Sequence, residues 1–257
     1  MCTPGTAGYS VADPIIPASA ETVLMETDWQ VASPQELKFT RTYRSRWGAS
    51  TATAGMGSNW SHSHAVSISV VGDNAVILFG DGSLRRFSRA SSTGAWSTVG
   101  NNDSLTANST GWLYRRADDV LQFNTVGQLL THTARNGWTL TYSYANGRLS
   151  QISNHFGRSL SLNYSGADQL TSINGSDGQL ISYEYDSNKR LLIVRQADNS
   201  FQTYLYENAA FPQALTGMLD ENGVRLASWS YDTQGRAIGN ERAGATSRYQ
   251  IDYSHAT

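Results

Sequence analysis

A repeat of about 21 residues in the second half of the chain limits its fold more than any other feature. Leucines recur at positions 129, 149, 170 and 191, and pairs of large side chains with one residue between them recur along the same stretch. These pairs are Tyr142/Tyr144, Leu162/Tyr164, Tyr183/Tyr185, Tyr204/Tyr206, Trp229/Tyr231 and Ile251/Tyr253. A unit this short cannot bury its own apolar face, so successive units must stack against one another.

The sequence of one unit is typical of a β-hairpin. Residues 170–173 alternate as a strand, residues 174–178 contain the glycines of a turn, and residues 179–185 form the return strand. A second turn begins at Asp186. A lone hairpin is marginally stable in water, so neighbouring hairpins must pair edge to edge. We therefore predict an all-β fold in which stacked β-hairpins form a curved, twisted sheet.

The tyrosines are expected to form a ladder across this sheet. Side chains two residues apart point to the same face of a strand, and aromatic cross-strand pairs are worth about 0.2–1 kcal/mol each. Their hydroxyl groups suit a face that borders a water-filled cavity. The positions expected to carry the repeat are Leu129, Tyr142, Tyr144, Leu149, Tyr164, Leu170, Tyr183, Tyr185, Asp186, Leu191, Tyr204, Tyr206, Trp229, Tyr231, Asp232, Gly235 and Tyr253.

The composition of the chain changes twice along its length. Residues 1–20 combine prolines and glycines with small side chains, as in a weakly ordered arm. Residues 21–110 contain short strand patterns, and residues 111–257 contain about six hairpin repeats, the last of them incomplete.

One strand pattern before the repeats carries charge. Residues 37–43 alternate strictly, which places Arg41 on the same face as Phe39 and Tyr43. We expect Arg41 to cap the interior of the sheet. Arg44 and Arg46 fall on the opposite face, where we expect them to be solvated.

Charge and cysteine content exclude several classes of function. The 257 residues include 19 Lys and Arg against 21 Asp and Glu, which gives a net charge of −2 and no strong field for nucleic acid or anionic membrane. Cys2 is the single cysteine, so no internal disulfide and no cysteine-based zinc site can form. No apolar run is long enough to cross a bilayer, and no classical signal peptide is evident. We expect a cytoplasmic protein that would need another route if it is secreted.

Candidate sites are few, and each has a plainer explanation. His62 and His64 could share a metal, but a third ligand is not evident, and we expect partly exposed strand residues near Trp60. The acidic pairs Asp118-Asp119 and Asp220-Glu221 fit turns better than the carboxylates of a glycosidase. We therefore expect no catalytic residue, no cofactor and no bound metal.

Two segments resemble a known family. Residues 231–236, with the sequence Tyr-Asp-Thr-Gln-Gly-Arg, and Tyr185-Asp186 are similar to the YD repeat of RHS (rearrangement hotspot) and teneurin-type proteins. Residues 37–46 and 55–62 resemble the opening module of the bacterial RHS core, and the resemblance extends over nearly the whole chain from residue 13. Some copies depart from the pattern, because Tyr164 is not followed by Asp and Tyr206 is followed by Glu207.

The resemblance implies a structural role. In that family many repeats spiral into a hollow β-shell around a toxic C-terminal domain, and the shells belong to polymorphic toxins of interbacterial competition, often delivered by type VI secretion. We expect a scaffold or encapsulating segment, an open piece of such a shell, and no enzyme. The family's Asp-Pro cleavage motif and PAAR-like tip have no counterpart here, which suggests a fragment without the toxin domain.

The expected partners are the rest of the RHS core or the C-terminal toxin domain. Self-association through the edge of the last strand is also expected.

Three alternatives stay open. The first is a carbohydrate-binding or cell-surface-binding repeat module, which an exposed, evenly spaced row of Trp or Tyr would support. The second is a hydrolase on a β-scaffold. The third is a β-propeller, because two successive units together have about the length of one propeller blade, about 40 residues.

Overall fold

The computed structural model describes residues 15–31, 34–47, 54–100, 102–245 and 248–254. Residues 1–14 of the expected N-terminal arm lie outside this described part. The described residues form three antiparallel sheets, without an α-helix among them. A short 3-10 helix, η2 (Ala243–Ala245), precedes the last strand.

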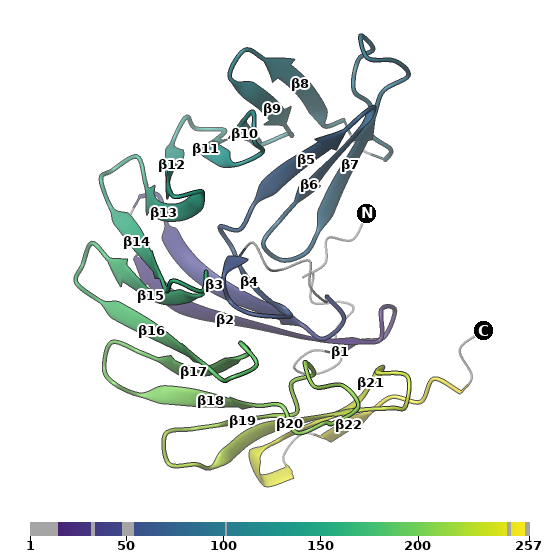
Figure 1. The fold of residues 1–257 in the computed structure, drawn as a ribbon, viewed down its shortest axis with the longest axis vertical. Coiled ribbons are helices and arrows are strands. Elements are labelled where there is room, and N and C mark those ends of the chain that lie inside the picture. Colours follow the sequence, from purple (N-terminus) through teal and green to yellow (C-terminus); the bar gives the residue numbers. More distant parts are fainter. Residues whose placement is uncertain (1–14, 32–33, 48–53, 101, 246–247, 255–257) are drawn as a thin grey trace.

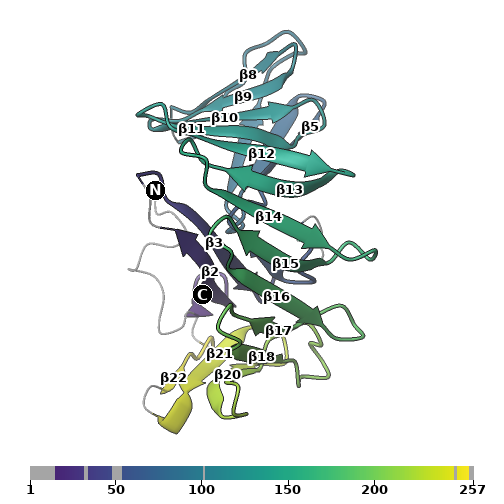
Figure 2. The same cartoon turned by 90° about the vertical axis from the view of Figure 1, so that its left-hand side faces the viewer.

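The largest sheet holds 15 strands, each hydrogen-bonded to its neighbours in chain order. Its strands are β8 (Ser104–Asn108), β9 (Gly111–Arg115), β10 (Asp119–Asn124), β11 (Leu129–Ala134), β12 (Thr139–Ala145), β13 (Arg148–Ser153), β14 (Ser159–Tyr164), β15 (Leu170–Gly175), β16 (Leu180–Tyr185), β17 (Leu191–Arg195), β18 (Phe201–Leu205), β19 (Gly217–Leu219), β20 (Arg225–Tyr231), β21 (Ala237–Arg242) and β22 (Arg248–Gln250). We call it the repeat sheet. It twists and curves in an open arc (Figures 1 and 2). The predicted all-β fold of stacked hairpins is confirmed.

The first part of the chain forms two smaller sheets. One contains β1 (Ile15–Ile16), β2 (Glu21–Val31), β3 (Leu37–Arg44) and β4 (Trp60–His62), and the other contains β5 (Ser67–Val71), β6 (Asn74–Leu78) and β7 (Leu84–Ser88). Figure 1 shows β2 and β3 lying inside the arc of the repeat sheet. We call β1–β4 and the loop that joins β3 to β4 the N-terminal module.

Side-chain oxygens organise the turns between repeats. In one YD copy, Asp186 Oδ1 accepts hydrogen bonds from the backbone N–H groups of Asn188 and Arg190, each at 2.9 Å, and Asp186 Oδ2 accepts one from Arg190 Nε at 2.6 Å. Asp232 repeats all three bonds, with Gly235 at a φ of 73° in the turn. The aspartate of the motif therefore fixes the turn and holds its arginine.

In four of the six pairs the second member, a tyrosine, lies at a change of register. Tyr144, Tyr164, Tyr185 and Tyr231 each stand where a β-bulge shifts the pairing with the next strand. The pairing of the tyrosine's strand with the preceding strand ends before the tyrosine. For example, β12 pairs with β11 only from Thr139 to Thr141, opposite Thr131 to Thr133. The strands diverge at this end of the hairpin, and the tyrosine ring lies beside the gap.

The tyrosine hydroxyl closes that gap by donating a hydrogen bond to a backbone carbonyl 15 or 16 residues earlier. We call this bond the tyrosine clamp. It joins Tyr144 to Leu129 (3.0 Å), Tyr185 to Leu170 (2.7 Å), Tyr206 to Leu191 (2.9 Å), Tyr231 to Leu215 (2.9 Å) and Tyr253 to Ala237 (3.0 Å). Tyr164 stands at the equivalent place, 15 residues after Leu149, but its hydroxyl makes no hydrogen bond to the described residues.

Removing a clamp should lower the free energy of unfolding more than removing a hydroxyl that makes no hydrogen bond. We expect Tyr144→Phe to lower the free energy of unfolding by about 1 kcal/mol, because the Leu129 carbonyl loses its donor. Tyr164→Phe should change it by less than about 0.5 kcal/mol. Urea unfolding of the two variants beside the parent chain measures the difference, and equal losses would show that the clamp contributes nothing.

Candidate functional site: the concave face of the repeat sheet

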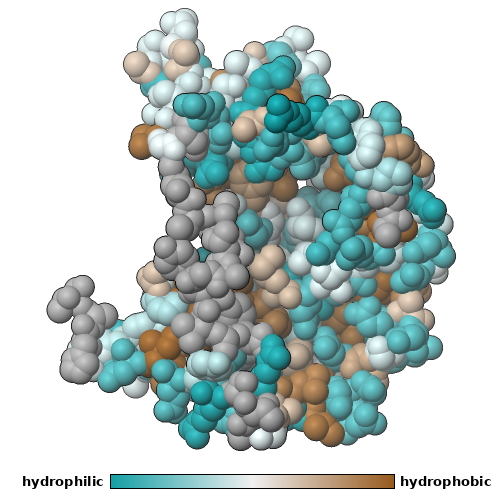
Figure 3. All heavy atoms as spheres, turned by 180° about the vertical axis from the view of Figure 1, so that it is seen from behind, coloured by the Kyte–Doolittle hydropathy of each residue, from teal (hydrophilic) through white to brown (hydrophobic). Residues whose placement is uncertain are grey.

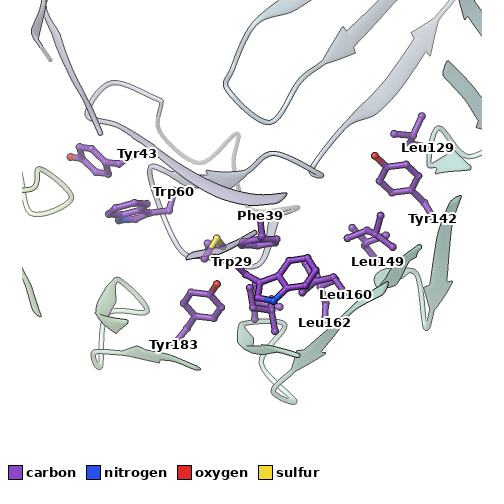
Figure 4. Close-up of a cluster of buried hydrophobic side chains, with 14 of the residues drawn as sticks. Trp29, Phe39, Tyr43, Trp60, Leu129, Tyr142, Leu149, Leu160, Leu162 and Tyr183 are labelled. Atoms are coloured by element: carbon purple, nitrogen blue, oxygen red, sulfur yellow. The ribbon is translucent and has the colours of Figure 1, made fainter. Parts of the chain in front are cut away.

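The concave face of the repeat sheet is lined by the first member of each pair and covered by the N-terminal module. Tyr142, Tyr183, Tyr204 and Trp229 are buried, as are the recurring leucines Leu129, Leu149, Leu170 and Leu191. Figure 4 shows residues of this face opposite aromatic side chains of β2–β4. The Trp60 and Tyr204 ring centroids lie 5.0 Å apart. Along this part of the arc a second layer of aromatic side chains fills the space where a water-filled cavity was expected.

A buried charged cluster lies at the centre of this interface. Arg41 is 1% exposed, and its guanidinium donates hydrogen bonds to Asp28 Oδ2 (2.6 Å), Glu26 Oε2 (2.9 Å) and Tyr204 Oη (3.0 Å). Tyr183 donates to Asp28 Oδ2 at 2.7 Å, and Tyr204 also donates to Glu26. We call these five residues the Arg41 cluster. It confirms that Arg41 faces the interior with Phe39 and Tyr43.

The electrostatics of the cluster follow from burial and mutual pairing. Burial raises the pKa of Asp28, although the nearby Arg41 charge works in the opposite direction. Burial alone would lower the pKa of Arg41, but the charge of Asp28 holds it well above its usual value. Burial also raises the pKa values of Tyr183 and Tyr204, so both hydroxyls remain hydrogen-bond donors. The cluster is a fixed set of hydrogen bonds across the two layers.

A glycine-containing loop of the N-terminal module docks between turns of the repeat sheet. Gly55 O accepts hydrogen bonds from the Leu170 N–H (2.7 Å) and the Tyr185 hydroxyl (3.2 Å). A Cβ atom at Gly57 would lie 2.4 Å from Lys189 O, and the residue has a φ of +81°. Only glycine fits there without displacing the turn.

Further polar contacts fix the module to successive repeats. Trp29 Nε1 donates to the Asp177 carboxylate at 3.1 Å, and Trp60 Nε1 donates to the Tyr206 hydroxyl at 2.9 Å. The Tyr43 hydroxyl accepts a hydrogen bond from the Leu215 N–H at 2.8 Å. These bonds join β2 to the turn between β15 and β16, and join β3 and β4 to the loop between β18 and β19.

The two histidines lie deeper than their sequence pattern suggested. His62 and His64 are 2% and 6% exposed, so the expectation of partly exposed residues is wrong. The His62 ring stacks on Phe39 with centroids 4.8 Å apart, and His64 Nε2 lies 2.9 Å from Lys38 O. Burial lowers the pKa of His62 to about 3 and that of His64 to about 4, so both are neutral at physiological pH.

Arg44 and Glu21 form an ion pair beside β3, and the Arg44 side chain is only 17% exposed. The expectation that Arg44 is solvated is therefore wrong. The alternation places Arg44 on the opposite face from Arg41, as expected, but β2 and the turn at Asp81 cover that face, and Arg44 Nη1 donates to Asp81 O at 3.2 Å.

The acidic pairs take part in turns and ion pairs. Asp220 Oδ1 accepts hydrogen bonds from the backbone N–H groups of Asn222 (3.0 Å) and Val224 (2.8 Å), as the YD aspartates do. Asp119 pairs with Arg116. Within the described residues, no three His, Cys, Asp or Glu side chains are grouped to hold a metal ion. No helix among those residues has the length and apolar character needed to span a bilayer.

Sequence reasoning found Arg41 but not the partners that hold it. Glu26 and Asp28 stand two residues apart on the strand before Arg41, which is a usable signal for an inward-facing acidic pair. Gly55 and Gly57 were a usable signal for the loop that docks against the repeat sheet. The Trp29–Asp177 bond joins residues 148 positions apart, so no local pattern could reveal it.

The Arg41 cluster makes a strong stability prediction. Arg41→Met keeps most of the side-chain volume but leaves the buried carboxylate of Asp28 and the partly buried one of Glu26 without their cation, so we expect a loss of about 3–5 kcal/mol in unfolding free energy. Arg89→Met is the matched control, because Arg89 pairs with a half-exposed Asp73. This substitution should lower the free energy of unfolding by less than about 1 kcal/mol. Chemical unfolding measures both losses. Equal losses would show that the cluster contributes no more to stability than an exposed ion pair does.

The buried histidines predict a dependence of stability on pH. Unfolded histidine has a pKa of about 6.5, whereas the folded values are about 3 and about 4. Between these values the unfolded chain binds more protons, so the free energy of unfolding falls as the pH drops from 7.5 to 5, by about 2 kcal/mol for each histidine. Urea unfolding at both pH values should show a smaller change for His64→Gln, and an unchanged difference would contradict the assignment.

Two family models match the chain. Residues 12–87 match a domain of unknown function, DUF6531, and residues 98–203 match the teneurin YD-shell. No match was found among curated proteins.

Several solved structures match part of the chain at low identity. A crystal structure of TcdB2-TccC3-Cdc42 has a TM-score of 0.41 and 15% identity over 65% of this chain and 11% of that chain. The Tc holotoxin pore of Photorhabdus luminescens has a TM-score of 0.40 and 15% identity, with the same coverage. TcdB2-TccC3 without its hypervariable C-terminal region has a TM-score of 0.42 and 12% identity over 85% of this chain. The chain spans 14% of the length of that last structure.

The strands from β8 to β17, the turn at Asp186 and the clamps of Tyr144 and Tyr185 lie within the segment that matches the YD-shell, and hairpins with the same turn and clamp continue beyond it. The DUF6531 match covers the N-terminal module. From the repeat and both family models, the chain is an RHS/YD-repeat protein.

Proposed function

We propose that the chain is a scaffold segment of an RHS-type shell whose concave side encloses a polypeptide, and that it acts by enclosure and not by catalysis. The observation that carries this proposal is the layered concave face. The aromatic side chains of successive hairpins point to the inside of one arc, and the N-terminal module is anchored there through the Arg41 cluster.

The same arrangement supports an extendable scaffold. The repeat sheet is open within the described residues, and β22 lies at one end of it with its three residues exposed. An unpaired strand edge accepts another strand. We propose that this edge receives a further hairpin from the remaining shell or, in its absence, from a second copy of the chain.

The resemblance to RHS proteins supports a finer form of the proposal. The enclosed polypeptide is then a toxin domain of a polymorphic toxin used between competing bacteria. The protein stays in the cytoplasm until a system such as type VI secretion exports it, and its partners are the remaining RHS core and the toxin domain.

Protease protection tests the enclosure. The gene product is purified from its producing cells, digested with trypsin under native conditions, and analysed by mass spectrometry. We expect a segment outside the repeats to resist cleavage until the shell is unfolded, and Arg41→Met to shorten that protection because it weakens the anchoring of the N-terminal module. Cleavage of every non-repeat segment at the rate of an unfolded control would overturn the enclosing role.

A further inference from the structure

A cavity lies between β5 and the turns that join β10–β14, away from the Arg41 cluster. It has a volume of about 640 Å³, which is within the range of small-molecule sites. Its walls include the apolar side chains of Val66, Trp112 and Leu149 and the rings of Tyr144 and Tyr164, with Arg148 beside them. Figure 3 shows the molecule from behind, with apolar side chains recessed between the upper and lower parts.

This cavity lies at one of the repeats that depart from the YD turn. The turn at Asp232 runs Tyr-Asp-Thr-Gln-Gly-Arg, whereas residues 144–148 read Tyr-Ala-Asn-Gly-Arg, one residue shorter and without the aspartate. Ala145 pairs directly with Arg148, and Asn146 and Gly147 have φ values of 51° and 78°. Two residues with positive φ form the tight hairpin turn that replaces the aspartate-stabilised one.

The shorter turn changes what the arginine contacts. Arg190 and Arg236 are each held by the aspartate of their own turn through a 2.6 Å bond. Arg148 has no such aspartate and extends instead to the next repeat, where it donates to Ser165 O at 3.3 Å and pairs with Asp168. The Asp168 side chain is 70% exposed, so this pair lies in water and is weak.

The tyrosine clamp is also missing at this place. Tyr164 lines the cavity, and its hydroxyl makes no hydrogen bond to the described residues, whereas five equivalent tyrosines donate to a carbonyl. Burial raises the pKa of Tyr164, so the hydroxyl keeps its proton. The ring is positioned by Arg148, whose Cζ lies 5.6 Å from the ring centroid. The cavity therefore has a positioned donor without an acceptor.

The charge of the cavity is one-sided. Arg148 is the one charged side chain among the described lining residues, which include no Asp or Glu. His62 and His64 also line it, but both are neutral, and the His64 ring nitrogens already face Lys38 O (2.9 Å) and the Tyr142 hydroxyl (3.4 Å). The cavity thus offers a cation and a free donor beside apolar walls.

We propose that this cavity binds a carboxylate carried on an apolar body, with Arg148 and Tyr164 donating hydrogen bonds to the carboxylate while Val66 and Trp112 pack against the apolar part. A guanidinium and a hydroxyl together match the acceptor geometry of a carboxylate. The carboxylate comes either from a small acid or from the C-terminus of a peptide. The site does not depend on the shell function.

Isothermal titration calorimetry of the full chain tests the carboxylate. The probes are hexanoate against hexanamide, and a leucine-terminated hexapeptide with a free carboxylate against its C-terminal amide. We expect each acid to bind at one site about tenfold or more tighter than its amide, since a hydrogen bond to a charged group contributes more than a neutral one. A peptide acid that binds at least tenfold tighter than hexanoate assigns the site to a chain terminus, and the reverse order assigns it to a small acid.

Three variants and a control separate the site from general apolar binding. Arg148→Gln and Tyr164→Phe should each weaken binding of the acid about tenfold, whereas Tyr253→Phe, which removes a tyrosine clamp outside the cavity, should leave the affinity within about twofold. Asp168→Asn should strengthen binding severalfold, because it removes the competing carboxylate and because asparagine tolerates the φ of 67°.

The proposal is overturned by three results. The first is equal affinity for acid and amide. The second is unchanged affinity in both Arg148→Gln and Tyr164→Phe when urea unfolding shows the variants folded. The third is the absence of saturable heat with any probe up to about 20 mM, which is the weakest affinity that a site of this kind should show.

Discussion

Contact between the N-terminal module and the concave face of the repeat sheet is the interaction on which the rest of this structure depends. A single curved sheet leaves one apolar face without cover, and such a face is stable only against a second layer. Here β2–β4 supply that layer for the hairpins from β12 to β20, through rings such as Trp60 against Tyr204. Because equivalent aromatic positions recur along the arc, one short module can make similar contacts with several hairpins.

The same recurrence creates a problem of register, which the Arg41 cluster answers. Leucine and tyrosine positions look alike in every repeat, so an interface of apolar contacts alone would be similar after a shift of one hairpin. The cluster removes that freedom, because Asp28 requires Tyr183 while Arg41 and Glu26 require Tyr204. A module shifted by one hairpin would keep its internal ion pairs but would place Leu162 or Trp229 where the cluster needs a tyrosine hydroxyl, and each buried hydrogen bond lost would cost about 1–3 kcal/mol. The bonds from the cluster to Tyr183 and Tyr204 therefore specify the register of the module.

The sequence allowed the repeat sheet to be predicted because each hairpin is encoded locally. The spacing of the tyrosine pairs, the aspartate at the turn and the alternation of strand residues all lie within about 21 residues. The inward direction of Arg41 was also readable from alternation. What could not be read was the layer that covers the tyrosines, since the contacts of Trp29 with Asp177 and of Tyr43 with Leu215 join residues far apart in the chain. The burial of His62 and His64 follows from that layer, and for this reason it was missed as well.

Departures from the repeat carry more information about function than the repeat itself. Each YD turn binds its own arginine, and each clamp satisfies its own carbonyl, so a regular hairpin has no polar group to offer a ligand. The hairpin at Tyr144–Arg148 gives up the aspartate, and the one that ends at Tyr164 gives up the clamp, although the spacing to Leu149 is kept. Loss of two stabilising devices in adjacent hairpins, both facing one cavity, is the pattern expected where local stability is exchanged for a binding site. In a scaffold of near-identical units, a broken local rule is therefore the most direct guide to where the scaffold does something else.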